Sequence, residues 1–248
     1  MDFTIKKPNH ILAALLVVFA FTLIILLPLF TYFQPISTTP SLNQLPQSMR
    51  FAVELFTLII QILFVAIGLF ILIPVIWYKL VNNYTKKQIL HQIKLRREAA
   101  DIAILWGILT MILMFITLFI IGIILTTLGY NLEQSGNIQD LKNLFSIPSL
   151  FIIVTIQPIG EEIFFRGFLL EKLKTTTGTL PAILITSILF GIAHLSAQNI
   201  YPAIITAILG ILLAYMVLKT KHLITAISAH IFYNIISVSL YLIGQSFI

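Results

Sequence analysis

Long apolar stretches alternate with short polar ones along the 248 residues of the chain. Seven of these stretches reach or approach the roughly 20 residues that a helix needs to cross a bilayer. The fifth and sixth are the short ones, and few residues join them. We therefore predict an all-α fold, a polytopic transmembrane bundle of about seven membrane segments. They lie at about 11–33, 51–78, 102–128, 148–170, 181–197, 201–218 and 223–246.

The composition supports a membrane protein without an aqueous domain. Hydrophobic residues make up 59% of the chain and charged residues 10%, whereas a soluble domain is about one quarter charged. The absence of cysteine excludes disulfides, thiolate metal sites and cysteine nucleophiles. The first segment is too long for the apolar part of a signal peptide, so we expect it to be retained. High use of Ile, Phe, Lys and Asn indicates a bacterial plasma membrane protein.

Basic residues predict the orientation of the segments, because cytoplasmic loops are enriched in Lys and Arg. If the seven segments alternate in direction, Arg50 and Lys142 fall on one side, Arg166 lies inside segment four, and the others share the opposite side. This bias places the N-terminus in the cytoplasm and the C-terminus outside. The net charge of +6 therefore reflects topology rather than nucleic-acid binding. The twelve cytoplasmic basic residues are Lys6, Lys7, Lys79, Lys86, Lys87, Lys94, Arg96, Arg97, Lys172, Lys174, Lys219 and Lys221.

The loops differ in character on the two sides. Residues 79–101 are basic and partly amphipathic, which predicts a cytoplasmic helix against anionic lipid headgroups; a loop that only sets topology is the alternative. The external stretches 34–50 and 129–147 are polar and contain Pro, Asn, Gln or Gly, as ordinary connectors do.

Two adjacent carboxylates, Glu161 and Glu162, lie inside segment four between Gly160 and Gly167. An ionisable residue at membrane depth is costly and indicates a functional site. Residues four apart share a helix face, so Glu162 can pair with Arg166, while Glu161 is turned about 100° away. A buried Glu–Arg pair that only locks helices together would explain Glu162 but not Glu161. We expect the flanking glycines to permit close helix approach.

Later segments carry three more polar candidates. His194 stands near the end of segment five, and His230 and Asn234 are four residues apart in segment seven, so they share a face. Taken singly, each has a structural interpretation as a core residue or as interhelical hydrogen bonding. Counted along the segments, however, all of them reach a depth similar to that of Glu161. The set suits activation of a water by Glu161 and His194, with His230 and Asn234 donating to an oxyanion.

Other protease designs do not fit the chain. It has no His-Glu-x-x-His helix for a zinc protease of that type, and no aspartate lies inside any of the seven segments. No serine stands in a recognisable nucleophile motif.

Three motifs together resemble the CAAX protease and bacteriocin-processing (CPBP or Abi) family, which includes the type II CAAX prenyl endopeptidases. They are Glu-Glu-x-x-x-Arg from Glu161, Phe-x-x-x-His ending at His194, and His-x-x-x-Asn from His230. The resemblance covers roughly residues 148–240, in the order and spacing of the family. It implies a catalytic membrane half at 148–248 and a variable half at 1–147 with three transmembrane segments and the basic cytoplasmic helix.

The resemblance also implies an intramembrane endopeptidase that acts on membrane-associated or lipidated peptides. Glu161 then corresponds to the water-activating glutamate, His194 to its partner, and His230 with Asn234 to the oxyanion donors. Glu162 and Arg166 complete the motif. A divalent metal such as zinc, held by Glu161, His194 and His230, and a metal-free glutamate mechanism both remain open.

Two other classes of function compete with the enzyme. A non-catalytic bacteriocin self-immunity or membrane scaffold protein would not require the Glu161, His194, His230 and Asn234 set. A proton-coupled transporter often shows internal repeats, and the sequence contains none that we detect. The implied partners are a peptide or protein substrate and the lipid bilayer.

Overall fold

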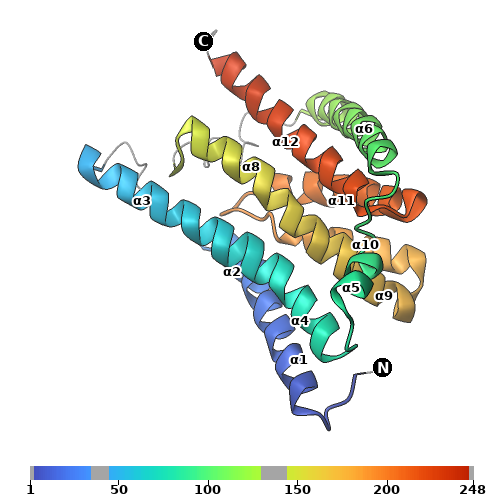
Figure 1. Ribbon diagram of the computed structural model, residues 1–248. Coiled ribbons are helices and arrows are strands. Elements are labelled where there is room, and N and C mark those ends of the chain that lie inside the picture. Colours follow the sequence, from blue (N-terminus) through green and yellow to red (C-terminus); the bar gives the residue numbers. More distant parts are fainter. Residues whose placement is uncertain (1–2, 35–44, 130–143, 246–248) are drawn as a thin grey trace.

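The computed structural model describes residues 3–34, 45–129 and 144–245, and within these ranges the chain forms helices and no strand (Figure 1). The all-α prediction is confirmed. Several long rods change from α-helix to π-helix and back, and the π-helical parts are labelled η. The elements are α1 (Pro8–Phe21), η1 (Thr22–Leu26), α2 (Leu27–Tyr32), α3 (Gln47–Ile59), η3 (Ile60–Leu72), α4 (Ile73–Leu80), α5 (Lys86–Gln92), α6 (Ala100–Thr127), α8 (Ile147–Glu162), η5 (Ile163–Leu169), α9 (Leu170–Thr177), α10 (Thr179–Ile192), α11 (Tyr201–Thr220) and α12 (Leu223–Gln245).

Six helical rods, rather than the seven predicted, are long and apolar enough to cross a membrane in the described part of the chain. The exception is the fifth segment, where α10 has 14 residues. At 1.5 Å per residue it spans about 21 Å, less than the roughly 30 Å hydrocarbon core. The predicted segment 181–197 was therefore too long at its C-terminal end, because the chain leaves the helix after Ile192.

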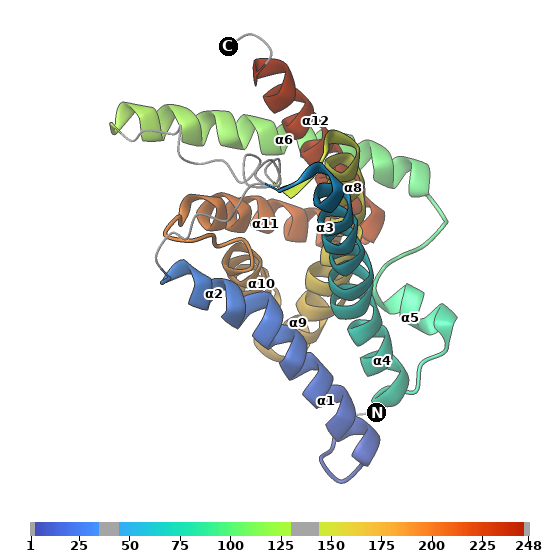
Figure 2. The ribbon, with the colours of Figure 1, turned by 90° about the vertical axis from the view of Figure 1, so that its left-hand side faces the viewer.

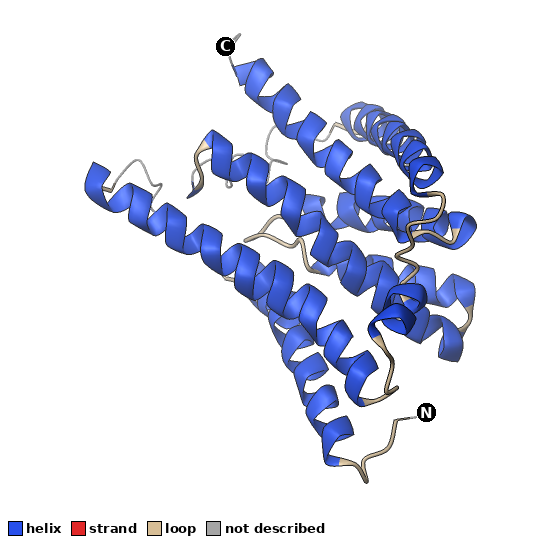
Figure 3. Cartoon of the chain, in the orientation of Figure 1, coloured by secondary structure: helices blue, strands red, loops and turns tan. Residues whose placement is uncertain are grey.

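The loop after α10 lies within the outline of the helices and is drawn in tan in Figure 3. The Gln198 N–H donates to the carbonyl of Tyr32 at the end of α2, at 3.1 Å. Leu195 and Ser196 line an internal cavity. Irregular backbone at membrane depth is tolerated where it is buried in protein or lines a cavity. The short α10 therefore brings the first residues of this loop to the cavity wall.

The rod formed by α8, η5 and α9 is the central element of the bundle. Every residue from Gly160 to Leu170 is buried, whereas α6 buries few of its side chains. Aromatic rings cluster around this rod: Phe164 lies 5.7 Å from Phe70 and Phe165 lies 5.0 Å from Phe190, centroid to centroid. Figure 2 shows α6 on the opposite side of the bundle from the rod of α1 and α2, with α11 and α10 between them.

Close helix contact at Gly160 sets the distance between α8 and η3. A Cβ atom at Gly160 would lie 2.7 Å from the Ala66 carbonyl oxygen and 3.0 Å from Phe70 Cβ. Figure 1 shows the two rods running side by side. At Gly167 a Cβ atom would lie 3.0 Å from Ile93 Cβ. The prediction that both glycines permit close approach is confirmed.

The basic segment 79–101 does not form one continuous helix, and that prediction was wrong. Between the end of α4 at Leu80 and the start of α6 at Ala100 only α5 is helical. It is started by a capping box in which Thr85 accepts from the Gln88 N–H. Asn83, Lys94 and Ala99 adopt left-handed backbone angles, which interrupt a helix. The predicted connectors at 34–50 and 129–147 fall for the most part outside the described residues.

Two contacts hold this basic segment against the C-terminal half. Lys94 forms an ion pair with Glu171 of α9, and the Lys94 carbonyl accepts from the N–H of Leu223 at 2.9 Å, where α12 begins. Burial lowers the pKa of Lys94, and the neighbouring Glu171 carboxylate opposes that shift. The segment is therefore docked on the protein through Lys94, and its contact with anionic headgroups stays a prediction.

Candidate functional site

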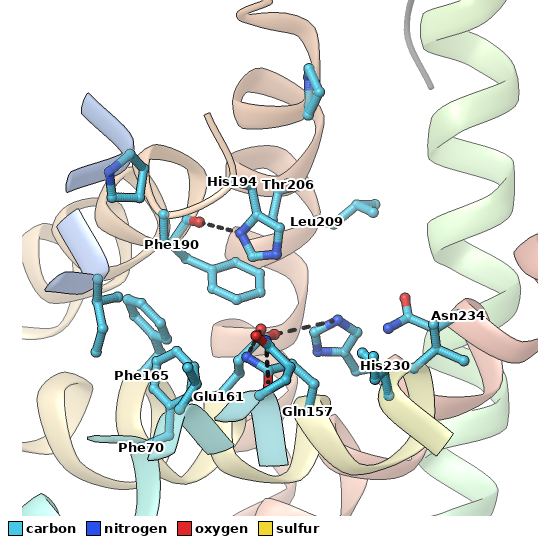
Figure 4. A pocket seen from close by; sticks show the side chains of 18 of the residues that line it. Phe70, Gln157, Glu161, Phe165, Phe190, His194, Thr206, Leu209, His230 and Asn234 are labelled. Carbon is cyan, nitrogen blue, oxygen red and sulfur yellow. Dashed lines mark hydrogen bonds and ion pairs between the residues drawn. The ribbon is translucent and has the colours of Figure 1, made fainter. Parts of the chain in front are cut away.

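A cavity of about 940 Å³ lies between the helices, and four of the six predicted site residues line it. Glu161, His194, His230 and Asn234 come from α8, the loop after α10, and α12. Figure 4 shows these side chains gathered around the Phe190 ring. The cavity takes further walls from η1, α2, η3 and α6, so both halves of the chain enclose it.

Glu162 and Arg166 lie behind the cavity wall as a buried pair. Arg166 Nη1 donates to Glu162 Oε1 at 2.8 Å, and the two side chains are 0% and 1% exposed. Arg166 Nη2 donates to the Gly210 carbonyl at 3.4 Å. The guanidinium also lies 4.0 Å from the centroid of Phe190. The predicted pairing of Glu162 with Arg166 is confirmed.

The local sequence explains why the neighbouring carboxylates face different surroundings. Successive helix residues are rotated by about 100°, so the side chains of Glu161 and Glu162 leave α8 in different directions. Pro158 lies within α8 and cannot donate a backbone hydrogen bond. The π-helix η5 begins directly after Glu162. Such segments often occur at functional sites.

His230 connects the two carboxylates. Its Nδ1 lies 2.9 Å from Glu162 Oε1 and its Nε2 lies 3.9 Å from Glu161 Oε2. Glu162 already accepts from Arg166, and an ionised carboxylate only accepts. His230 Nδ1 therefore carries the proton of that bond. The Nε2 separation is too long for a direct hydrogen bond.

His194 lies in the turn just after α10 rather than inside the helix. Its Nδ1 lies 2.8 Å from the Phe190 carbonyl oxygen. A carbonyl oxygen only accepts, so Nδ1 is the protonated nitrogen and Nε2 is left with a lone pair. In Figure 4 the Phe190 ring lies between His194 and Glu161. The sharing of one water by Glu161 and His194 stays a prediction.

Asn234 is half-buried on α12, one turn beyond His230, and both line the cavity. The expectation that they share one face of the helix is confirmed. Figure 4 shows the Asn234 amide beside the His230 ring. An amide nitrogen at this position is a hydrogen-bond donor on the cavity wall.

Two glutamines extend the site beyond the sequence-based prediction. Gln157 Nε2 donates to Glu161 Oε1 at 3.1 Å, and Gln61 Nε2 donates to Gln157 Oε1 at 3.2 Å. The spacing of four residues between Gln157 and Glu161 could have identified the first contact. Nothing in the sequence pairs Gln61 with segment four, because that contact depends on helix packing.

The predicted metal ligands do not form a metal site as they are positioned. Zinc is held by side-chain nitrogen and oxygen atoms at about 2.0–2.2 Å. Among the described residues, no group of three or more His, Cys, Asp or Glu side chains has a metal-holding arrangement. In the set of Glu161, His194 and His230, Nδ1 of each histidine faces an oxygen, and Nε2 is the nitrogen that a metal would bind. Zinc binding and a metal-free mechanism both stay predictions.

The arrangement can support proton transfer in a largely apolar chamber. Glu161 faces the cavity, His194 offers a lone pair at Nε2, and the Asn234 amide offers donors. Hydrogen-bond donors and charges fixed in an apolar site stabilise developing charge more than they would in water. A carboxylate, an imidazole nitrogen with a lone pair and amide donors thus line the same cavity.

Two comparisons with known proteins find related sequences. Residues 143–236 match the family model described as type II CAAX prenyl endopeptidase Rce1-like. The chain is 30% identical over 144 residues to the "Putative membrane peptidase YdiL" of Bacillus subtilis (strain 168). That alignment covers 56% of this chain and 57% of the relative, so the chain spans a little over half of the curated protein that it matches. No solved structure matches the chain.

Proposed function

We propose that this chain, which is related through residues 143–236 to the type II CAAX prenyl endopeptidases, is an intramembrane endopeptidase. The observation that carries the proposal is the division of the carboxylates. Glu162 is locked to Arg166, whereas Glu161 faces a cavity that His194, His230 and Asn234 also line. A purely structural Glu–Arg pair does not account for Glu161.

Glu161 acts as the general base in this proposal. Its carboxylate takes a proton from a water held between it and the polar cavity wall, and His194 Nε2 helps to orient that water. The water oxygen forms a bond to the carbonyl carbon of the scissile peptide, and the carbonyl π electrons move to its oxygen. General-base catalysis of this kind contributes roughly 10²–10⁴-fold.

Asn234 and His230 stabilise the tetrahedral intermediate. The Asn234 amide donates to the oxyanion, and His230 contributes where Nε2 carries a proton. Glu161 then returns its proton to the leaving nitrogen as the C–N bond breaks. The products are a carboxylic acid and an amine, and Glu161 is again ionised, so protons and electrons balance.

Membrane-associated or lipidated peptides fit the cavity as substrates. Its walls are mainly Leu, Ile, Val and Phe side chains, which suit an apolar ligand. The bacteriocin-linked alternative, a self-immunity or scaffold protein, would bind a peptide in the same cavity without cleaving it.

The test uses the purified full-length protein in lipid nanodiscs with a panel of fluorogenic lipidated and unmodified membrane peptides. We expect turnover by the wild type and a loss of at least about 100-fold in Glu161→Gln, the lower limit of a general base's contribution. Glu98→Gln is the matched control, because Glu98 is exposed and lies outside the cavity. Binding of peptides without cleavage would support the immunity or scaffold interpretation instead.

A further inference from the structure

Three polar side chains form a line from η3 into the cavity. Gln61 on η3 donates to Gln157 on α8 at 3.2 Å, and Gln157 donates to Glu161 at 3.1 Å. All three line the cavity. Gln61 belongs to the half of the chain that carries no motif, yet it lies two hydrogen bonds from the proposed base.

The direction of these hydrogen bonds follows from chemistry. An ionised Glu161 only accepts, so Gln157 must turn its NH₂ group toward it. The Gln157 carbonyl oxygen then faces Gln61, which must donate its own NH₂ group. One charged group at the end of the line therefore fixes the orientation of both amides.

Helix packing brings the two glutamines together. The contact between Gly160 and Ala66 joins α8 and η3 at backbone distance. Gln157 precedes Gly160 by one turn, and Gln61 precedes Ala66 by about one wider turn of η3. The two helices run in the same direction (Figure 1), so both glutamines lie on the same side of the contact.

We propose that Gln157 and Gln61 are positioning residues that hold the Glu161 carboxylate for catalysis. Gln157 donates to Oε1 of Glu161, and Oε2 lies 3.9 Å from Nε2 of His230. In this proposal Oε2 is the oxygen that receives the proton of the water. Gln61 acts through Gln157. This inference rests on the proposed endopeptidase function and adds to it a contribution from the N-terminal half.

Two other roles for the glutamines make different predictions. If they only join α8 to η3, their loss lowers stability and leaves turnover per folded molecule unchanged. If their amides bind the substrate backbone, their loss raises KM. A positioning role lowers kcat, because misplacement of a catalytic group by about 1 Å can cost 100-fold.

The experiment measures kcat, KM and melting temperature for Gln157→Met, Gln61→Met and the double variant, in the nanodisc assay above. Methionine keeps the length of the side chain and removes its donors. We expect kcat to fall about 10- to 100-fold in Gln157→Met and less in Gln61→Met, with KM within about threefold of the wild type. Because Gln61 acts through Gln157, the double variant should be no slower than Gln157→Met alone.

Thr155→Val is the matched control on α8, since Thr155 bonds only within its own helix in the described contacts and does not line the cavity. If Gln157→Met fails to fold, the kcat and KM of Gln61→Met still test the inference. Unchanged kcat in folded variants, a rise in KM alone, or losses that multiply in the double variant would each overturn the inference. Wild-type protein without turnover, or Glu161→Gln with full turnover, would reject the proposed function and this inference with it.

Discussion

Glu161 and Glu162 are adjacent in α8, but their side chains lie in different surroundings. Glu162 is 0% exposed and shares one oxygen between Arg166 and His230, whereas Glu161 lines the cavity. A buried ion pair is costly to break because the remaining partner is left unpaired in a low-dielectric site. The imidazole of His230 lies close to Glu161, with its Nε2 3.9 Å from Oε2.

The two carboxylates should therefore respond differently to the same substitution. Glu162→Gln leaves Arg166 buried without a counter-charge, and we expect it to destabilise the fold by about 3–5 kcal/mol. Glu161→Gln should fold nearly as well as the wild type. Expression yield and melting temperature of both purified variants measure this. Equal stability of the two would contradict the division of roles.

Asn234 offers a second test at the same scale. If its amide stabilises the oxyanion, Asn234→Ala should lower turnover by roughly 100- to 1,000-fold. KM should change much less, because the interaction strengthens only in the transition state. Turnover and melting temperature are measured on the same sample. Near-normal turnover in a destabilised protein would indicate that Asn234 serves only to hold helices together.

Individual elements place the site by their lengths and contact points. The 14-residue α10 is short, so His194 lies on a loop inside the bundle. The contact between α8 and η3 occurs where a glycine meets a backbone carbonyl. Small residues permit such approach in membrane helices, and here the approach also aligns Gln61 with Gln157.

A methyl group at position 160 should disturb this contact. In Gly160→Ala the new Cβ would lie 2.7 Å from the Ala66 carbonyl oxygen, so the backbones must move apart. We expect a loss of about 1–3 kcal/mol, the usual cost of overpacking, together with reduced turnover. Gly244→Ala on α12 is the control, because a Cβ atom there would have no described neighbour within 4 Å. An equally mild effect at both positions would show that α8 and η3 can separate without consequence.

At the scale of the whole molecule, the rods surround one cavity to which both halves of the chain contribute. The C-terminal half supplies the predicted catalytic residues, and the N-terminal half supplies Gln61 and much of the apolar wall. The chain is an integral membrane protein with six long apolar rods and one short helix in its described part. If α10 crosses the membrane, α11 begins on the side opposite to the start of α10. If α10 turns back, α11 begins on the same side.

The orientation prediction can be tested without a structure. The bias of Lys and Arg predicts that residues 79–101 face the cytoplasm and that the C-terminus faces outward. Reporter fusions within 86–92 and after Ile248 should read as cytoplasmic and external. A cytoplasmic reading after Ile248 would show that α10 turns back without crossing. Because α10 is short, the reporter after Ile248 is the one that shows whether α10 crosses the membrane.

The sequence by itself determined the class of the protein and the identity of most site residues. Apolar runs long enough to cross a bilayer need a helix to satisfy their backbone groups, and this requirement is local to each run. The pairing of Glu162 with Arg166 and the shared face of His230 and Asn234 also follow from helix periodicity alone. The three motifs carried the family resemblance for the same reason, since each occupies a single segment.

Only the tertiary structure decided how the segments meet. It placed His194 on a loop, joined His230 to Glu162, and brought Gln61 to Gln157 across more than ninety positions of sequence. It also broke the basic segment 79–101 at three left-handed residues and docked it through Lys94. These features depend on contacts between segments and on the register set at close helix crossings, and periodicity within one segment carries no information about either.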